Sequence, residues 1–386
     1  MLEGQHIICF AHDWGSDPTS KTHIMRILAR RGNRVLWVNS IAMRRPTASR
    51  RDLGRQATKL HHALDGCREV EPNLFVFNPL VLPLPGVAVA DRFNAALLGR
   101  QLRRQFARYG FERPILWTFL PYVNRLVGRL GERMLIYHCV DEYSAFAGVP
   151  RQALIRNDRD LVRRADLVVT SSELLCQERR ALNPNTHFVS HGVDTEHFAA
   201  ALDPSTPIPH DVSRLPHPIV GFFGLLAEWV DLDVVRAIAT AHPDWSVVLI
   251  GRATTSLAPV SGLPNVHVLG PRPYAQLPAY CRGFDVGIIP FRHSDLTVRA
   301  NPLKLREYLA AGLPVVATDL PEIRRYDHLV RLATGPTSFV RAIEATLEGR
   351  DRTRAREYQE AMRGESWDAR VEELSALIEG ATALRP

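Results

Sequence analysis

One stretch of the sequence places a helix start, a helix end and a following strand in direct succession: Ala300-Asn301-Pro302-Leu303-Lys304-Leu305-Arg306-Glu307-Tyr308-Leu309-Ala310-Ala311-Gly312-Leu313-Pro314-Val315-Val316. Asn301 is a residue type favoured at a helix N-cap, and Pro302 fits the first helical position. The apolar run at 314–318 is typical of a buried parallel strand. The stretch therefore predicts a helix that leads directly into a buried strand.

Lys304 is an unusual residue within this stretch. The sequence has 48 Lys plus Arg, and only Lys21, Lys59 and Lys304 are lysine. Lys304 falls in the first turn of the expected helix, where the helix dipole disfavours a cation. A bound anion would offset that cost, and a phosphate at the helix N-terminus is the simplest candidate.

Apolar strand candidates alternate with helical patterns along the whole chain. The candidates are 6–10, 34–39, 74–78, 115–118, 134–138, 167–171, 187–190, 219–224, 246–251, 266–270, 286–290, 314–318 and 329–332. Short Val, Ile and Leu runs separated by helices predict parallel sheets covered on both faces. Two such series predict an α/β fold with two doubly wound, Rossmann-like domains. The stretch 199–217, rich in Pro, Ser, Asp and His, is the predicted linker between them.

Composition limits the class of protein and its compartment. The chain has 386 residues, 46% of them hydrophobic, and a formal net charge of +7. Its five cysteines are scattered without Cys-x-x-Cys spacing, and we expect neither a zinc site nor a disulfide framework. With no apolar run long enough to span a bilayer and no secretory leader, the expected location is the cytoplasm.

Arginines concentrate in the first half of the chain, which suggests an anionic partner. No nucleic-acid-binding motif accompanies them, so we expect no nucleic acid and favour an anionic membrane surface. The stretch Arg92–Arg108 predicts a basic amphipathic helix, with Phe93, Leu97, Leu98, Leu102 and Phe106 on one side, seated on the inner leaflet. The alternative is an ordinary domain helix, with arginine used throughout the chain.

Several blocks, taken in order, resemble the GT-B glycosyltransferases of the large retaining family 4 type, in particular bacterial members that build exopolysaccharide or teichuronic-acid-like polymers. The blocks are 137–146 (Tyr137-His138-Cys139-Val140-Asp141-Glu142 and onward), 165–172, 191–198, 221–229, 268–270, 284–291, 301–316 and 366–370. The resemblance implies two Rossmann-like domains that face a cleft. It assigns residues 1–198 to acceptor binding, 218–364 to nucleotide-sugar binding and 365–386 to a C-terminal helix that returns to the first domain.

The resemblance assigns roles to residues of the second domain. Glu307 would hydrogen-bond the donor ribose, Gly224 would let the backbone approach the diphosphate, and Thr297 with Arg299 would touch the sugar or phosphate. Two departures stand out: Arg299 occupies a place where the family has a glutamate, and the loop 224–231 lacks the family's basic pair. We therefore expect Lys304 and Arg299, together with the main-chain amides near Asn301, to neutralise the charge of the diphosphate. Arg292 and Arg272 are the next candidates for this role.

Candidate catalytic residues follow strands of the first domain. His12 and Asp13 follow strand 6–10, and Asp141 with Glu142 follows strand 134–138. In open α/β sheets ligands bind beyond the carboxyl ends of strands, so both pairs should face the ligand. Asp141 is the favoured contact to the acceptor hydroxyl; it would be the general base if the reaction inverts, whereas in a retaining reaction the leaving phosphate can take the proton.

The expected function is transfer of a hexose-type sugar from a nucleotide diphosphate sugar, UDP-sugar favoured, to a hydroxyl of a lipid-linked glycan. Retention is favoured, with no cofactor and no metal, because the Asp-x-Asp pairs at 158–160 and 231–233 fall on predicted helices. Three alternatives stay open: a small-aglycone glycosyltransferase, a nucleotide-sugar epimerase on the same fold, and a donor-binding protein without activity.

Overall fold

The computed structural model describes residues 2–15, 17–40, 66–82, 84, 87–349 and 354–383. The chain divides into two compact units, which are described separately. Unit 1 comprises Met1–Ser190 and Arg370–Pro386, and unit 2 comprises His191–Ala369. Within the described ranges, no helix is both long and apolar enough to cross a membrane.

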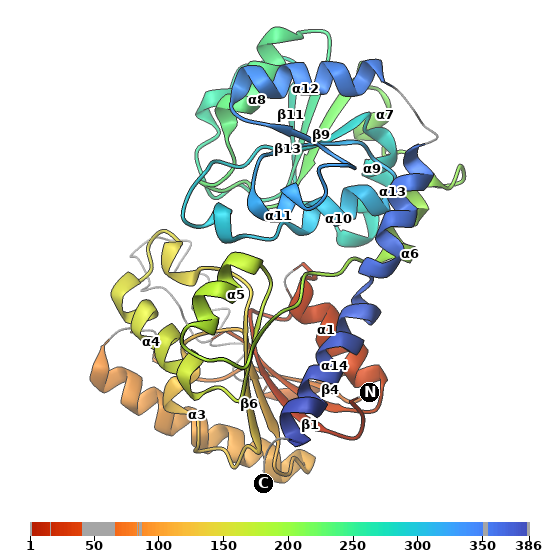
Figure 1. Cartoon of the computed structure of the whole chain (residues 1–386). Helices are drawn as coiled ribbons and strands as arrows, with labels where there is room; N and C mark the ends of the chain where they lie inside the picture. Colours follow the sequence, from red (N-terminus) through yellow and green to blue (C-terminus); the bar gives the residue numbers. More distant parts are fainter. Residues whose placement is uncertain are drawn as a thin grey trace. The chain divides into compact units, whose positions relative to one another are not determined.

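Unit 1 is built on an eight-stranded sheet with the order β3-β4-β2-β1-β5-β6-β7-β8 (Figure 1). Its strands are β1 His6–Phe10, β2 Arg34–Val38, β3 Cys67–Glu71, β4 Leu74–Phe77, β5 Ile115–Thr118, β6 Met134–Cys139, β7 Leu167–Thr170 and β8 Thr186–Phe188. Its helices are α1 Ser20–Arg30, α3 Ala88–Tyr109, η1 Val123–Arg125, η2 Tyr143–Ala145, α4 Arg151–Arg164, α5 Glu173–Arg180 and most of α14 Trp367–Ala383. All strand pairs are parallel except β3 with β4.

The two faces of this sheet are covered by different helices. Residues such as Phe10 and Tyr137 pack with α3, α4 and α5 in one apolar cluster. The alternate residues of the strands point to the opposite face. On that side Lys21 of α1 lies 5.9 Å from the ring of Phe119, and Thr382 of α14 donates a hydrogen bond to the sulfur of Met134. The last helix of the chain thus packs on a sheet whose strands all lie in the first half of the chain.

Unit 2 is built on a six-stranded, wholly parallel sheet with the order β11-β10-β9-β12-β13-β14. Its strands are β9 Ile219–Phe223, β10 Ser246–Ile250, β11 Val266–Gly270, β12 Val286–Ile289, β13 Val315–Thr318 and β14 Arg331–Ala333. Its helices are α6 Thr195–Ala199, η3 Ala200–Leu202, α7 His210–Ser213, α8 Leu232–Ala241, η4 Ala258–Val260, η5 Tyr274–Gln276, α9 Leu277–Gly283, η6 Thr297–Arg299, α10 Leu303–Ala310, α11 Pro321–Arg324, α12 Pro336–Glu348, α13 Arg354–Met362 and η7 Arg363–Glu365.

Two apolar clusters sandwich the second sheet. One joins Phe223 and Ile289 to α6, α9, α10 and α13, and the other joins Phe222 and Ile288 to α8 and α12 (Figure 1). Adjacent residues of β9 therefore point to opposite layers, as expected for a doubly wound sheet. The predicted α/β class with two parallel-sheet domains is confirmed.

Two expectations from the sequence need correction. The stretch 199–217 belongs to unit 2, where it forms η3 and α7, because Ala201 and Val212 are buried in the same cluster as α9 and α10. Helix α3 does not offer its apolar side to a membrane, since Leu98, Leu102 and Phe106 are buried against the sheet. The antiparallel strand β3, Cys67–Glu71, was not expected, because its charged residues give no apolar run.

Candidate functional site

Gly224 occupies a crowded position directly after β9. Its φ is +147°, and a Cβ there would lie 3.0 Å from Cε of Lys304. Gly251, directly after β10, is more constrained, because its Cβ would lie 1.8 Å from the carbonyl oxygen of Gly224. Glycine is thus required at both strand ends, and the bare backbone beside Lys304 leaves room for a ligand to approach closely.

Helix α10 begins one residue later than its sequence suggests. Pro302 is the N-cap and Leu303 the first helical residue, so Lys304 is the second. Asn301 does not cap the helix, because its Oδ1 accepts a 2.7 Å hydrogen bond from the buried guanidinium of Arg306. No side chain caps this N-terminus, and its amide dipoles point toward the edge where Lys304 stands.

Lys304 and Glu307 form the centre of the candidate donor site. Their Nζ and Oε2 atoms are 3.6 Å apart, and the ammonium also lies 5.6 Å from the ring of Phe223. Glu307 is only 8% exposed, and its Oε2 is buried with no hydrogen-bond donor among the described residues. A buried carboxylate oxygen without a donor is costly, so this atom is available for a donor group of a ligand, such as a hydroxyl.

Three other cations considered for the diphosphate are held by partners of their own. Arg299 donates to the carbonyl oxygen of Asp295 at 2.9 Å. Arg292 contacts carboxylates of Asp231 and Asp233 at the start of α8, at 3.3 and 3.5 Å.

Arg272 is held even more firmly. It donates to Asp211 at 2.8 Å and to the Tyr280 hydroxyl at 2.7 Å, which ties the end of β11 to α7 and α9. These hydrogen bonds raise the pKa of Arg272. This guanidinium closes a structural network, and its predicted contact with the donor stays a prediction. Lys304 is the cation that stands beside Gly224.

Thr297 is buried within its own loop rather than presented to a sugar. Its hydroxyl donates to the carbonyl oxygen of Arg292 at 2.5 Å and lies 3.1 Å from the hydroxyl of Ser294. The side chain is 1% exposed. Thr297 therefore shapes the 292–300 loop, and its contact with the donor stays a prediction.

Asp141 is the main acidic candidate of unit 1. It follows β6, at the carboxyl end of the sheet. Burial raises its pKa to about 6, while the ammonium of Lys21 lowers it and Glu142 raises it further. Asp141 thus changes its protonation state near neutral pH, as a group that handles protons should.

The two acids predicted beside Asp141 have structural partners. Glu142 accepts 2.7 Å and 2.6 Å hydrogen bonds from Arg179 and the Ser144 hydroxyl. Burial opposes ionisation of Glu142, but Arg179 and Ser144 together lower its pKa. Asp13 accepts a hydrogen bond from the Ser40 amide at 3.0 Å, which ties the turn after β1 to the end of β2. We keep Asp141 as the acidic candidate.

A group of nitrogen atoms near Asp141 was not recognised from the sequence. Lys21 occupies the second position of α1, and its charge acts on Asp141, His12 and His138. Burial first and Lys21 second lower the pKa of each histidine to about 3, so both rings are neutral. Both ring nitrogens of His12, Nδ1 of His138 and Nε1 of Trp117 are buried without hydrogen-bond partners in the described chain.

The rarity of lysine in the sequence could have revealed Lys21, because the same oddity pointed to Lys304. The partnerless nitrogens could not be read from sequence, since burial and tertiary contacts decide them. Lys21 acts on Asp141, His12 and His138 alike, and these residues make a second candidate polar site.

The carboxylates of both Asp-x-Asp pairs contact groups of the protein itself. Asp158 accepts from the Tyr137 hydroxyl at 2.6 Å and pairs with Arg179, while Asp231 accepts from the Asp233 amide and caps α8. Within the described ranges, no group of three or more His, Cys, Asp or Glu side chains is positioned to hold a metal ion.

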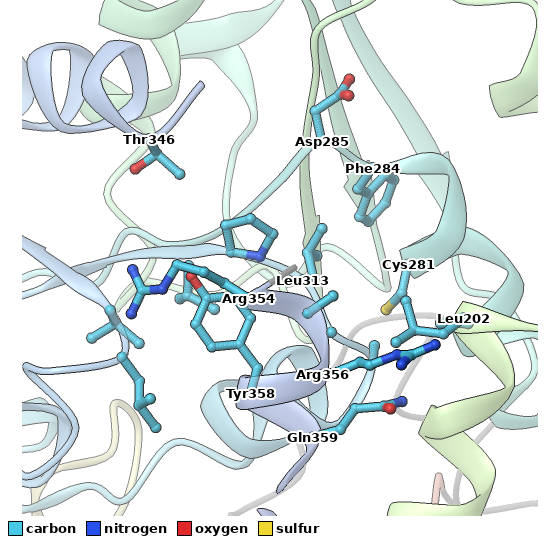
Figure 2. A pocket seen from close by; sticks show the side chains of 18 of the residues that line it. Leu202, Cys281, Phe284, Asp285, Leu313, Thr346, Arg354, Arg356, Tyr358 and Gln359 are labelled. Carbon is cyan, nitrogen blue, oxygen red and sulfur yellow. The ribbon is translucent and has the colours of Figure 1, made fainter. Parts of the chain in front are cut away.

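A cavity of about 830 Å³ in unit 2 lies at the opposite edge of the sheet. Its lining includes Asp285, Pro314 and Val330, which directly precede β12, β13 and β14. Figure 2 shows Arg354, Arg356, Tyr358 and Gln359 of α13 along this cavity. Lys304 and Gly224 stand at the carboxyl ends of the strands, so the cavity is separate from the candidate donor site.

The family comparison supports the assignment of unit 2. Residues 217–349 match the family model described as glycosyl transferases group 1. The match includes Gly224, Lys304 and Glu307, the residues that the geometry brings together.

Two curated relatives align with part of the chain. One, from Bacillus subtilis (strain 168), is named "Putative teichuronic acid biosynthesis glycosyltransferase TuaH"; it is 28% identical over 256 residues, 61% of this chain and 64% of that protein. The other is the lipopolysaccharide core biosynthesis mannosyltransferase LpsB of Rhizobium meliloti (strain 1021), 29% identical over 42% of this chain and 47% of its own length. The alignments thus span less than two thirds of either relative.

Solved structures share the fold along nearly the whole chain. Sucrose-phosphate synthase from Thermosynechococcus elongatus has a TM-score of 0.73 at 16% identity, covering 99% of this chain and all of that one. HepE from Anabaena, solved in complex with UDP, has a TM-score of 0.67 at 15% identity, covering 97% of this chain and all of that one. The architecture is that of the GT-B glycosyltransferases.

Proposed function

We propose that the protein is a glycosyltransferase that moves a hexose-type sugar from a UDP-sugar to a hydroxyl of a lipid-linked glycan. The observation that carries this proposal is the Glu307 carboxylate: it is buried, has an oxygen without a donor, and stands 3.6 Å from Lys304 beside Gly224. A nucleotide diphosphate offers both complements, ribose hydroxyls for the carboxylate and phosphate oxygens for the ammonium.

In this proposal unit 2 stabilises the leaving diphosphate. Charge on the diphosphate grows as the bond to the sugar breaks, and the Lys304 ammonium with the uncapped amides of α10 would meet that charge. Gly224 keeps the approach open, because any Cβ there would press on Lys304. No metal is required, since the cation and the helix N-terminus supply the electrostatic stabilisation.

Unit 1 would bind the acceptor around Asp141. Lys21 holds Asp141 partly ionised despite burial, so the carboxylate can accept a hydrogen bond from the acceptor hydroxyl. The neutral rings of His12 and His138 supply further polar atoms for sugar hydroxyls. We favour retention of configuration, in which the leaving phosphate takes the acceptor proton and Asp141 orients the hydroxyl.

The donor and acceptor classes rest on different supports. UDP is favoured because the structural neighbour HepE is described in complex with it. A polymeric, lipid-linked acceptor is favoured because the two curated relatives are named for teichuronic acid and lipopolysaccharide core biosynthesis. For this chain, the UDP donor and the lipid-linked acceptor are proposals.

A transfer assay tests the proposal directly. The purified protein is incubated with labelled UDP-sugars and either a lipid-linked glycan extract or soluble small aglycones, with and without a metal chelator. We expect labelled lipid-linked product, undiminished by chelator, with the donor's anomeric configuration by NMR. Transfer to small aglycones alone would mean that the acceptor is a small molecule and not a lipid-linked glycan. Conversion of the UDP-sugar in the absence of any acceptor would indicate an epimerase.

A second candidate, donor binding without turnover, is favoured by one observation. Arg299 occupies a position where the family that the chain resembles has a glutamate. Its guanidinium contacts Asp295, so the position supplies no carboxylate. Calorimetry that shows UDP-sugar binding, combined with an absence of any product in the transfer assay, would support this candidate and overturn the enzyme.

A further inference from the structure

Large apolar side chains on the surface of unit 1 gather in one segment. Among the described residues, ten large hydrophobic side chains are well exposed, and six of them lie within residues 80–93: Leu80, Leu82, Leu84, Val87, Val89 and Phe93. Val89 is 77% exposed and Phe93 53%. We call these six residues the apolar patch; clustered exposed apolar residues of this kind mark interaction sites.

Side-chain amides of α3 hold the first part of this patch in place. The Asn94 amide group exchanges two hydrogen bonds with the main chain of Leu82, at 2.7 and 2.9 Å. The Gln101 amide group does the same with the main chain of Leu80, at 3.0 and 2.9 Å. The segment therefore runs antiparallel along α3 with its backbone polar groups satisfied at both points, so it can leave water at little cost.

An arginine ridge continues the same exposed face of α3. Arg92, Arg100, Arg103 and Arg104 are exposed, and at helical spacing they share a face with Val89 and Phe93. None of the four forms an ion pair with a residue that the structure describes. Asp91 is the single acidic residue of this helix, so the ridge carries a large net positive charge.

We propose that the apolar patch and the arginine ridge form a docking surface for an anionic phospholipid bilayer. The patch would enter the boundary between headgroups and acyl chains, while the long arginine side chains reach the phosphates. This reverses the orientation expected from the sequence: Leu98, Leu102 and Phe106 bury themselves in the unit, and the opposite side of α3 meets the lipid. The proposal rests on the proposed function only in that a lipid-linked acceptor gives the docking a purpose.

Charge argues against a second copy of the chain as the occupant. An isologous interface centred on this face would bring two arginine ridges together. An anionic bilayer supplies the opposite charge, and the attraction should fall as salt screens it.

Vesicle flotation tests the surface with three matched variants. One replaces Leu82, Val89 and Phe93 by Gln, and one replaces Arg100, Arg103 and Arg104 by Gln. The control replaces Arg156, Arg159 and Arg163 by Gln; these are exposed on α4 and remove the same charge. Vesicles are phosphatidylcholine alone or mixed with phosphatidylglycerol, and thermal unfolding with UDP calorimetry shows that each variant is folded.

We expect wild type and the α4 control to float with the mixed vesicles. The arginine variant should bind about a hundredfold more weakly, at about fivefold per arginine, and the apolar variant should lose binding at raised salt. All should retain wild-type UDP affinity, because the substitutions lie in unit 1.

Three outcomes would overturn the surface while leaving the proposed function intact. In the first, the wild type binds UDP but does not float with the vesicles. In the second, the α4 control loses flotation as strongly as the arginine variant. In the third, light scattering shows a dimer of the wild type and a monomer of the apolar variant. Loss of UDP binding in the wild type would instead contradict the proposed function and leave the flotation result standing.

Discussion

Lys21 and Lys304 occupy equivalent places in the two units, yet their surroundings differ. Each is the second residue of a helix at the carboxyl edge of a parallel sheet. Lys304 stands next to bare glycine backbone with an incompletely satisfied carboxylate. The Lys21 ammonium lies 5.9 Å from the ring of Phe119, and burial lowers its pKa despite the nearby Asp141.

The contrast extends to the helix ends. The Thr22 hydroxyl accepts a 3.4 Å hydrogen bond from the Thr19 amide at the start of α1, whereas Pro302, the N-cap of α10, has no amide hydrogen to donate. Neither N-cap side chain accepts a hydrogen bond from its helix. Lys304 thus places a charge beside bare backbone, whereas Lys21 places a charge that lowers the pKa of the neighbouring Asp141. Lys59 lies outside the described residues.

The largest effect should come from Asp141→Asn. This change keeps the size of the side chain but removes the charge, so we expect transfer to fall by about 10²–10⁴-fold. UDP affinity, measured by calorimetry, should stay at the wild-type value because unit 2 is untouched. In the wild type, transfer should rise with pH through about 6 as the Asp141 carboxyl ionises. Normal transfer by the variant would show that Asp141 has no catalytic role.

Lys304→Ala should weaken UDP binding by about 1.5–3 kcal/mol, the contribution of a charge-assisted contact. Arg292→Ala is the matched control, since that cation is paired with carboxylates at the start of α8. Calorimetry should show a much smaller change for the control. Equal losses in both variants would mean that Lys304 has no special place at the phosphates.

Glu307→Gln should weaken UDP binding by about 1–2 kcal/mol, because a neutral amide is a poorer acceptor for ribose hydroxyls. Comparison with UDP lacking a ribose hydroxyl makes the test specific. The wild type should bind the deoxy analogue more weakly than UDP, and the variant should discriminate less between the two ligands. Undiminished discrimination would leave Glu307 as a simple ion-pair partner of Lys304.

Lys21→Met should produce the smallest effect, a displacement of the pH profile. Lys21 lowers the pKa of Asp141, so its removal raises that pKa further above 6 and moves the acidic limb of kcat/KM to higher pH. UDP affinity should not change. Lys21→Arg keeps the charge and should leave the limb near its wild-type position; a limb that moves equally in both variants would indicate packing rather than charge.

Local sequence predicted most strands because they are compact apolar runs that are buried on both faces, whereas β3 has no such run. It also singled out Lys304, Glu307 and Gly224, which the fold places near one another at a helix start and a strand end; their role at a donor stays a prediction. Other candidate residues have partners within the protein that local sequence does not reveal. Arg272 is held by Asp211, Asn301 by Arg306 and Glu142 by Arg179, and two of these three partners lie far away along the chain. Tertiary hydrogen bonds of this kind leave no local pattern.

The last helix has a consequence for the order in which the chain can acquire its structure. Val371, Leu374 and Ile378 of α14 are buried, and Glu372 pairs with Arg31 of α1 at 3.5 Å. On a ribosome, all of unit 2 is synthesised between Ser190 and these residues, a delay of about 10–35 s. During this time one face of the sheet of unit 1 is incompletely covered. Unit 2 is one uninterrupted segment of the chain, so it can fold before unit 1 is complete.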